Sequence, residues 1–152
     1  MEYGSIERDF HVEASPEVVF EVLSSPAHIK EWWGCETGIE PAAGSASELV
    51  WGDGVAVPIT VLQADPPRLF SFRWAGTSSP DGPAPAEGNS LLVTFVLTPS
   101  ATGTSVRLTE TGFREIGWEV AVLEETYRDH EVGWTLHLGH LGEYLTRLVS
   151  AS

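Results

Sequence analysis

EVAVLEETYRDHEVGWTLHLGHLGEYLTRLVS, residues 119–150, is the stretch that decides the fold. Large apolar side chains recur in it at alternating steps of four and three, which places them on one face of an α-helix. They are Trp134, Leu138, Leu141, Leu145 and Leu148. A helix of about thirty residues is about 45 Å long. An apolar stripe of this length has to be buried, so the rest of the chain must provide a broad apolar partner for it.

The middle of the chain, residues 37–113, is expected to be that partner, as an antiparallel β-sheet. Apolar and polar side chains alternate along it with the period of half-buried strands. The expected strands are Glu48–Trp51, Val55–Val61, Leu69–Trp74, Leu91–Leu97 and Val106–Glu110, with a tight turn at Gly52-Asp53-Gly54. No helical pattern separates these strands, which favours antiparallel pairing.

Residues 76–88, GTSSPDGPAPAEG, form a long connection between two of these strands. Glycine and proline make up six of its thirteen residues. Two interpretations stay open: a tolerated flexible insertion, or a lid over the mouth of a pocket.

The N-terminal part of the sequence predicts one strand followed by two short helices. Residues Ser5–Val12 alternate in polarity as a strand does. Ser15-Pro16-Glu17 then combines a helix cap, a first-turn proline and an acidic residue, and starts a helix that runs to about Ser24. A second helix spans Ala27–Trp33 and ends at Gly34. The predicted fold class is therefore α+β.

Length, charge and cysteine content limit the function classes. The 152 residues suit one domain, residues 1–152, and the formal charge of −14 argues against nucleic acid or an anionic membrane as partner. No apolar run reaches the length of a membrane span, so membrane insertion is not expected. Cys35 is the only cysteine, and the charged N-terminus does not resemble a signal peptide. We expect a soluble, cytoplasmic protein.

Several short motifs occur in a characteristic order along the chain. They are ASPEVVF at 14–20, Trp32-Trp33, Val93-Thr94-Phe95, Gly103-Thr104, LTETGF at 108–113, and Gly133-Trp134 followed by the leucines of the long helix. In this order they resemble the helix-grip fold of the START and birch-pollen-allergen (SRPBCC) superfamily, in the branch homologous to the C-terminal domain of the Hsp90 ATPase activators.

This resemblance implies a curved antiparallel sheet of about six or seven strands wrapped around the long C-terminal helix. It also implies a cavity between sheet and helix, which holds a hydrophobic ligand in many relatives. Those relatives include lipid and hormone binders, polyketide aromatases and cyclases, and antibiotic self-resistance proteins. The branch has no shared catalytic motif, so the resemblance indicates fold more strongly than function.

Inward-pointing aromatic side chains are the main candidates for the cavity wall, together with a few polar groups and helix residues. The predicted ligand-binding residues are Trp33, Trp51, Phe72, Trp74, Phe95, Glu110, His130, Trp134, His137, Leu138 and Leu141. The alternative is that the aromatic rings simply fill the core at normal packing density.

Glu110 is the most informative single residue, because strand parity points its carboxylate toward the concave face of the sheet. A buried charge needs a partner. An ion pair with Arg8 is the expected arrangement; a ligand hydrogen-bond acceptor, or an acid kept protonated by burial, is the alternative. Glu110, His137 and His130 are the weak candidates for acid–base catalysis. Neither a metal site nor a cofactor is expected, because the histidine spacing provides no third convergent ligand.

The favoured interpretation is binding of a small hydrophobic molecule, aromatic or polyketide-like, without turnover. Three alternatives stay open: a polyketide aromatase or cyclase, an antibiotic self-resistance protein that is consumed as it traps a reactive compound, and a chaperone-associated interaction module. The last would bind a protein partner or a second copy of the chain through an exposed apolar patch, for which Trp32, Trp33 and Trp118 are the candidates.

Overall fold

The computed structural model describes residues 4–52, 54–74 and 85–150. Its elements, in chain order, are β1 (Ser5–Val12), α1 (Pro16–Ser24), α2 (Pro26–Trp32), β2 (Ala46–Val50), β3 (Ala56–Asp65), β4 (Leu69–Trp74), β5 (Leu91–Ser100), β6 (Gly103–Thr111) and α3 (Val120–Ser150). This is the α+β order that the sequence predicted.

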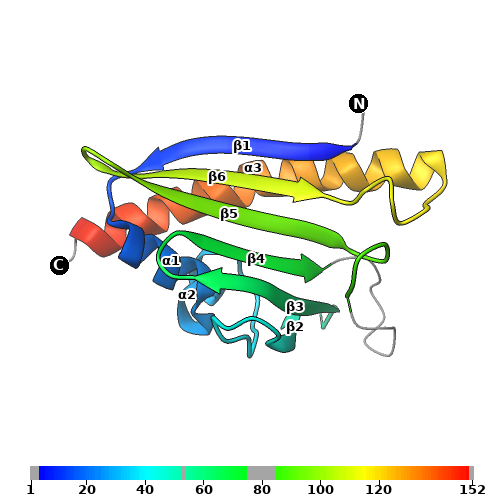
Figure 1. The fold of residues 1–152 in the computed structure, drawn as a ribbon, viewed down its shortest axis with the longest axis horizontal. Helices are drawn as coiled ribbons and strands as arrows, with labels where there is room; N and C mark the ends of the chain where they lie inside the picture. Colours follow the sequence, from blue (N-terminus) through cyan, green and yellow to red (C-terminus); the bar gives the residue numbers. More distant parts are fainter. Residues whose placement is uncertain (1–3, 53, 75–84, 151–152) are drawn as a thin grey trace.

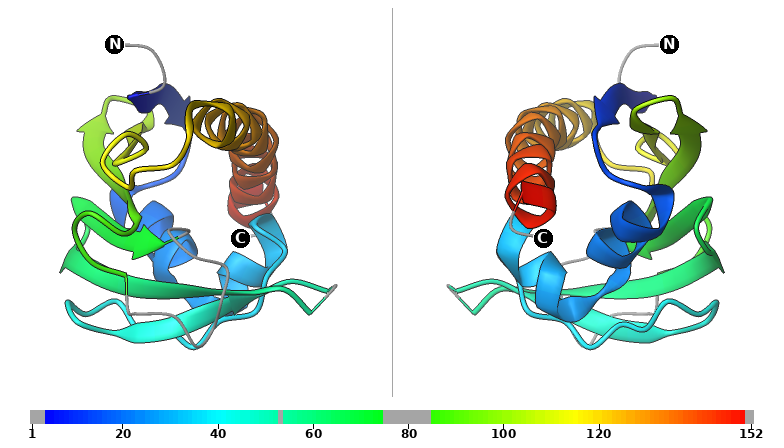
Figure 2. Two further views of the ribbon diagram at one scale, coloured as in Figure 1. Left: turned by 90° about the vertical axis from the view of Figure 1, so that its right-hand side faces the viewer. Right: turned by 90° about the vertical axis from the view of Figure 1, so that its left-hand side faces the viewer.

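The six strands of the described ranges form one antiparallel sheet in the order β1-β6-β5-β4-β3-β2. Viewed end on, the sheet curves, and α3 lies opposite its concave side (Figures 1 and 2). The helices α1 and α2 close the end of this arrangement that lies near the C-terminus of α3. The predicted helix-grip architecture is confirmed.

Local sequence signals explain where the two short helices begin and end. The Ser15 hydroxyl accepts a hydrogen bond from the Val18 amide at 3.3 Å, and proline stands at the first turn of both helices. Gly34 follows α2 with a φ of +82°, a conformation that glycine adopts without strain. The predicted N-cap and the predicted helix end at Gly34 are both confirmed.

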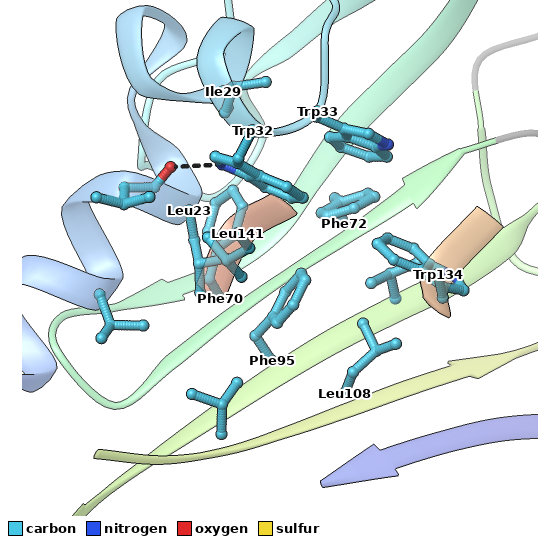
Figure 3. Close-up of a cluster of buried hydrophobic side chains, with 14 of the residues drawn as sticks. Leu23, Ile29, Trp32, Trp33, Phe70, Phe72, Phe95, Leu108, Trp134 and Leu141 are labelled. Carbon is cyan, nitrogen blue, oxygen red and sulfur yellow. Dashed lines mark hydrogen bonds between the residues drawn. The ribbon is translucent and has the colours of Figure 1, made fainter. Parts of the chain in front are cut away.

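Aromatic side chains fill the space between α2, the sheet and α3 (Figure 3). The Trp32 indole donates to the Val22 carbonyl at 2.9 Å and stacks on Trp33, with ring centroids 5.3 Å apart. Phe72 and Phe95 are almost fully buried beneath them. Each buried indole or phenyl ring adds a large apolar area to the core.

The apolar stripe of α3 lies as predicted. Trp134, Leu141 and Leu145 are buried, and the two remaining leucines of the stripe are partly buried. The hydroxyl of Tyr144 also forms a 2.6 Å hydrogen bond with His28 of α2. The long helix is therefore attached to the short helices as well as to the sheet.

The glycines of α3 do not mark a close approach of backbone to backbone. A Cβ at Gly139 or Gly142 would meet no atom within 4 Å, and one at Gly133 would meet only His137 Cδ2, at 3.9 Å. At Gly103, between β5 and β6, a Cβ would instead lie 2.1 Å from the Val12 carbonyl oxygen.

These contacts predict opposite effects for two Gly→Ala substitutions. Gly103→Ala should lower the free energy of unfolding by about 1–3 kcal/mol, because the methyl group forces β1 and the β5–β6 turn apart. Gly139→Ala should raise it by up to about 1 kcal/mol, because alanine favours helix and the site is open. Urea unfolding measures both. Equal effects of the two substitutions would contradict this account.

Candidate functional site

The carboxylate of Glu110 is fully buried and is held by three N–H groups. Trp74 Nε1 donates to Oε2 at 2.8 Å, and Trp134 Nε1 donates to Oε1 at 2.8 Å. His130 Nδ1 lies 2.9 Å from the same Oε1. Because a carboxylate can only accept, His130 Nδ1 carries a proton in this arrangement. Three donors replace the water that Glu110 loses on burial.

The secondary structure explains why these groups meet. Glu110 lies on β6 between β1 and β5, Trp74 ends β4, and His130 and Trp134 are one helical turn apart on α3. Residues four apart in a helix share a face, so both α3 side chains reach the same carboxylate. Glu110 therefore connects the sheet to the long helix.

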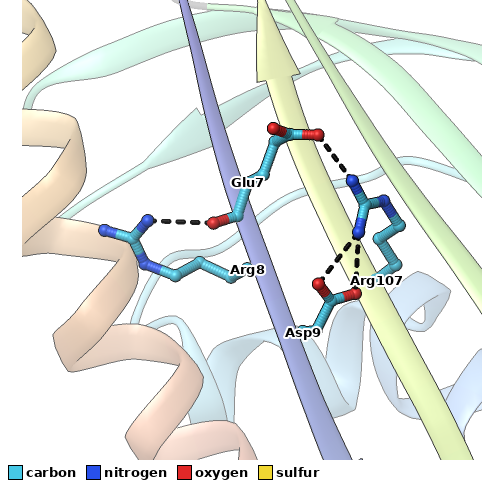
Figure 4. Close-up of polar contacts among 4 residues, drawn as sticks. All are labelled: Glu7, Arg8, Asp9 and Arg107. Carbon is cyan, nitrogen blue, oxygen red and sulfur yellow. Dashed lines mark hydrogen bonds and ion pairs between the residues drawn. The ribbon is translucent and has the colours of Figure 1, made fainter.

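The expected ion pair between Arg8 and Glu110 is wrong, because the Arg8 side chain bonds the Glu7 backbone carbonyl instead (Figure 4). The strand register places Ile6 opposite Glu110 and Arg8 opposite Leu108. The Arg8 guanidinium donates to the Glu7 carbonyl at 3.0 Å and lies 4.0 Å from the Glu131 carboxylate of α3. A two-residue offset along β1 thus separates the charges, and indole and imidazole N–H groups take the predicted place of the arginine.

A recess of about 200 Å³ lies beside this hydrogen-bonded cluster. Its lining residues come from the end of α2, the segment after β2, the end of β4 and the middle of α3. They are Trp33, Trp51, Trp74, Asp129, His130, Gly133, Trp134 and His137. Ligand pockets for drug-sized molecules measure about 300–1,000 Å³, so this recess suits a smaller molecule.

Trp33 is the centre of the aromatic wall. Its ring centroid lies 5.1 Å from that of Trp74, 5.6 Å from that of Trp134 and 6.2 Å from that of Trp51. The rings of Trp33 and Trp51 are nearly perpendicular, at 88°. Edge-to-face contacts of this kind fix the rings relative to one another, so the wall is formed before any ligand binds.

His137 lines the recess and has one unsatisfied polar atom. Its Nδ1 is buried and has no hydrogen-bond partner within the part of the chain that the structure describes. Burial, and to a smaller extent the neighbouring His140, lowers the pKa of His137 below its ordinary value of 6.5. At neutral pH this imidazole is uncharged.

The structure separates the predicted ligand-binding residues into three groups. Six of them line the recess: Trp33, Trp51, Trp74, His130, Trp134 and His137. Glu110 does not line it but accepts hydrogen bonds from three of these side chains. Phe72, Phe95 and Leu141 lie in the packed core (Figure 3). Leu138 faces a separate groove of about 820 Å³ between β1 and the C-terminal half of α3.

Asp129 and Gly133 line the recess although we did not predict them. Both precede predicted site residues by one position on α3, and 129, 133 and 137 follow the four-residue helical spacing. That spacing could have identified them.

The predicted exposed tryptophan patch is absent. Trp32 and Trp33 are buried, at 2% and 4% exposure, and Trp118 is partly buried against the core. Trp32 is held inward because its N–H reaches the Val22 carbonyl. Trp32 and Trp33 therefore offer almost no exposed surface for a protein partner.

Two classes of chemistry find no support among the described residues. No group of three His, Cys, Asp or Glu side chains there could hold a metal ion. Cys35 is buried, and burial raises the pKa of its thiol to about 12, which suppresses the reactive thiolate.

No helix in the described ranges is long and apolar enough to cross a membrane.

The lowered pKa of His137 predicts how stability depends on pH. Between the folded-state pKa and 6.5 the unfolded chain binds the proton that the folded chain excludes, so stability falls as pH falls. Thermal melting between about pH 8 and about pH 5 should show a smaller loss for His137→Gln than for the parent chain. His140→Gln removes only the smaller cause of the lowered pKa. This variant should therefore lose almost as much stability as the parent chain when the pH falls. Identical profiles for His137→Gln and the parent would contradict this assignment.

Solved structures with the same fold agree with this architecture. The protein MLL2253 from Mesorhizobium loti has a TM-score of 0.77 and 24% identity, with 94% of this chain and 97% of that chain covered. DynU16, from the dynemicin biosynthetic locus, has a TM-score of 0.71 and 21% identity over 94% of this chain, which spans 47% of DynU16. The Aha1 dimer from Colwellia psychrerythraea has a TM-score of 0.69 and 20% identity, with 93% and 95% covered.

At these identities the solved structures establish the fold alone. A comparison with curated proteins found no match. The family model described as "Activator of Hsp90 ATPase homolog 1-like protein", in contrast, matches residues 13–146, which is most of the chain and includes the whole recess. The chain therefore belongs to the family of Activator of Hsp90 ATPase homolog 1-like proteins.

Proposed function

We propose that this protein binds a small, largely apolar molecule in the tryptophan-lined recess. The observation that carries the proposal is the convergence of four indole rings and the imidazoles of His130 and His137 around one hollow. Ligand sites typically combine apolar and aromatic walls with a few placed polar groups. The larger groove beside β1 lacks this combination.

The groove between β1 and α3 is larger, but its lining is less suited to an apolar ligand. Glu13, Glu143 and Arg147 contribute charged side chains to it, and no tryptophan reaches it. Charged side chains on an open surface stay hydrated and favour no apolar ligand. Aromatic side chains, in contrast, are stabilised when a ligand covers them and removes them from water. The smaller recess is therefore the better candidate.

The volume of the recess limits the size of the ligands that it can hold. About 200 Å³ accommodates a molecule smaller than a typical drug, so compounds with one ring or a short branched chain are favoured over steroids or multi-ring polyketides. A small-molecule ligand also agrees with the setting of the fold neighbour DynU16, which comes from a biosynthetic locus.

Two glycines of α3 provide a matched test. Gly133→Leu should fill the recess and abolish binding of any compound that quenches tryptophan fluorescence and raises the melting midpoint of the parent chain. Gly139→Leu lies on the groove side of the same helix and should leave binding unchanged. At 100 times its Kd a ligand should stabilise the parent by about 2.7 kcal/mol.

The compounds tested for binding should include small aromatic alcohols, acids and amines as well as fatty acids and flavonoids. Loss of binding in Gly139→Leu but not in Gly133→Leu would place the site in the groove and contradict the proposal. No response from any compound would favour a protein-interaction module instead. Because the Colwellia psychrerythraea relative is a dimer, sedimentation should establish the oligomeric state of each variant.

Acid–base catalysis is the second candidate function, and one contact favours it. Glu110 accepts from His130 Nδ1, which leaves Nε2 as the basic nitrogen of a side chain that lines the recess. A carboxylate that orients a histidine in this way is common in general-base catalysis. The same contact is also a sufficient structural explanation for the buried carboxylate.

Glu110→Gln separates the two functions. The amide cannot accept from all three N–H groups as the carboxylate does, so the free energy of unfolding should fall by about 1–3 kcal/mol while the fold persists. A pure binding protein should retain most of its affinity for a neutral compound, measured by fluorescence titration. Conversion of a bound compound by the parent but not by Glu110→Gln, followed by mass spectrometry, would instead establish catalysis.

A further inference from the structure

The charge around the tryptophan recess has one sign. Asp129 is an exposed lining residue, and the buried carboxylate of Glu110 accepts hydrogen bonds from two of the lining indoles. Among the described residues that line the recess there is neither lysine nor arginine. The whole chain has a formal charge of −14. The field in this recess therefore attracts cations and repels anions.

The indole rings add to this preference. The only polar atoms of Trp74 and Trp134 are occupied by Glu110, so both rings can offer a ligand only carbon and π-electron surface. Donation of an N–H to an anion increases the electron density of the ring, which strengthens its attraction for a positive charge. Tryptophan is already the best aromatic partner for a cation, and clusters of aromatic rings recognise quaternary ammonium groups.

His137 does not oppose a cation in the recess. Its imidazole is uncharged at neutral pH, and its buried Nδ1 still lacks a partner within the described ranges.

Resting on the proposed function, we infer that the molecule bound in the recess is a small organic cation, a tertiary or quaternary ammonium group with short apolar substituents. The methyl or methylene groups around the charge pack against the tryptophan carbons. The charge itself is attracted by the ring faces and by the Asp129 carboxylate. The ligand is thereby both largely apolar and positively charged, which a recess of about 200 Å³ accommodates.

Choline and its uncharged isostere 3,3-dimethyl-1-butanol test this inference. Both have the same shape, so apolar burial favours them equally, and only the charge differs. At constant ionic strength, choline should bind the parent chain about tenfold more tightly in a fluorescence titration. Equal affinities would overturn the cation inference and leave the proposed function intact.

Two variants test which residues make choline bind more tightly than its uncharged isostere. Trp51→Leu keeps an apolar side chain but removes one ring, so it should weaken choline several-fold and change the isostere little. Asp129→Asn changes an exposed side chain that does not hold the fold, and should weaken choline only; Glu125→Gln, an exposed acid of the same helix outside the recess, is its control. Equal effects of Asp129→Asn and Glu125→Gln on choline would contradict a role for Asp129.

The full panel separates failure of this inference from failure of the proposed function. If neither choline nor the isostere binds but a neutral compound binds and is lost in Gly133→Leu, only the cation inference fails. If nothing binds to the folded parent chain, both fail.

Discussion

The structure depends on one buried carboxylate. Glu110 has no exposed surface, and its charge is tolerated because Trp74, Trp134 and His130 each direct an N–H group at it. Removing a carboxylate from water without such donors costs several kcal/mol. The three donors come from β4 and α3, while Glu110 belongs to β6, so this buried polar cluster joins the long helix to the sheet.

The same cluster creates the recess beside it. Two indoles turn their polar edges inward to Glu110, which leaves their carbon atoms as the part that can meet a ligand. Beneath them, Phe72, Phe95 and Leu141 fill the core, so the cavity expected between sheet and helix is reduced to a small hollow near the middle of α3. The fold and the proposed binding surface therefore have a common physical origin, and the filled core would limit any ligand bound there to a small molecule.

The fold could be predicted because its signals are periodic. The stripe from Trp134 to Leu148 specified a long buried helix, and strand parity correctly turned Glu110 inward. The partner of Glu110 could not be predicted, because it depends on register: Arg8 has the right parity but lies two residues from the position opposite Glu110. Likewise, no periodicity reveals that the Trp32 N–H reaches the Val22 carbonyl, which buries a ring expected at the surface. The size of the recess depends on side-chain packing, which a pattern of residue types does not specify.

The indole N–H signals of the six tryptophans, observed by two-dimensional NMR, test the central claim most directly. In the free protein, the Nε1 protons of Trp74 and Trp134 should resonate downfield of the others, because they alone donate to a carboxylate in the described structure. On addition of a compound that raises the melting midpoint, the signals of Trp33, Trp51, Trp74 and Trp134 should move, while those of Trp32 and Trp118 stay in place. Movement confined to Trp32 and Trp118, or Trp74 and Trp134 signals without a downfield shift, would contradict the account.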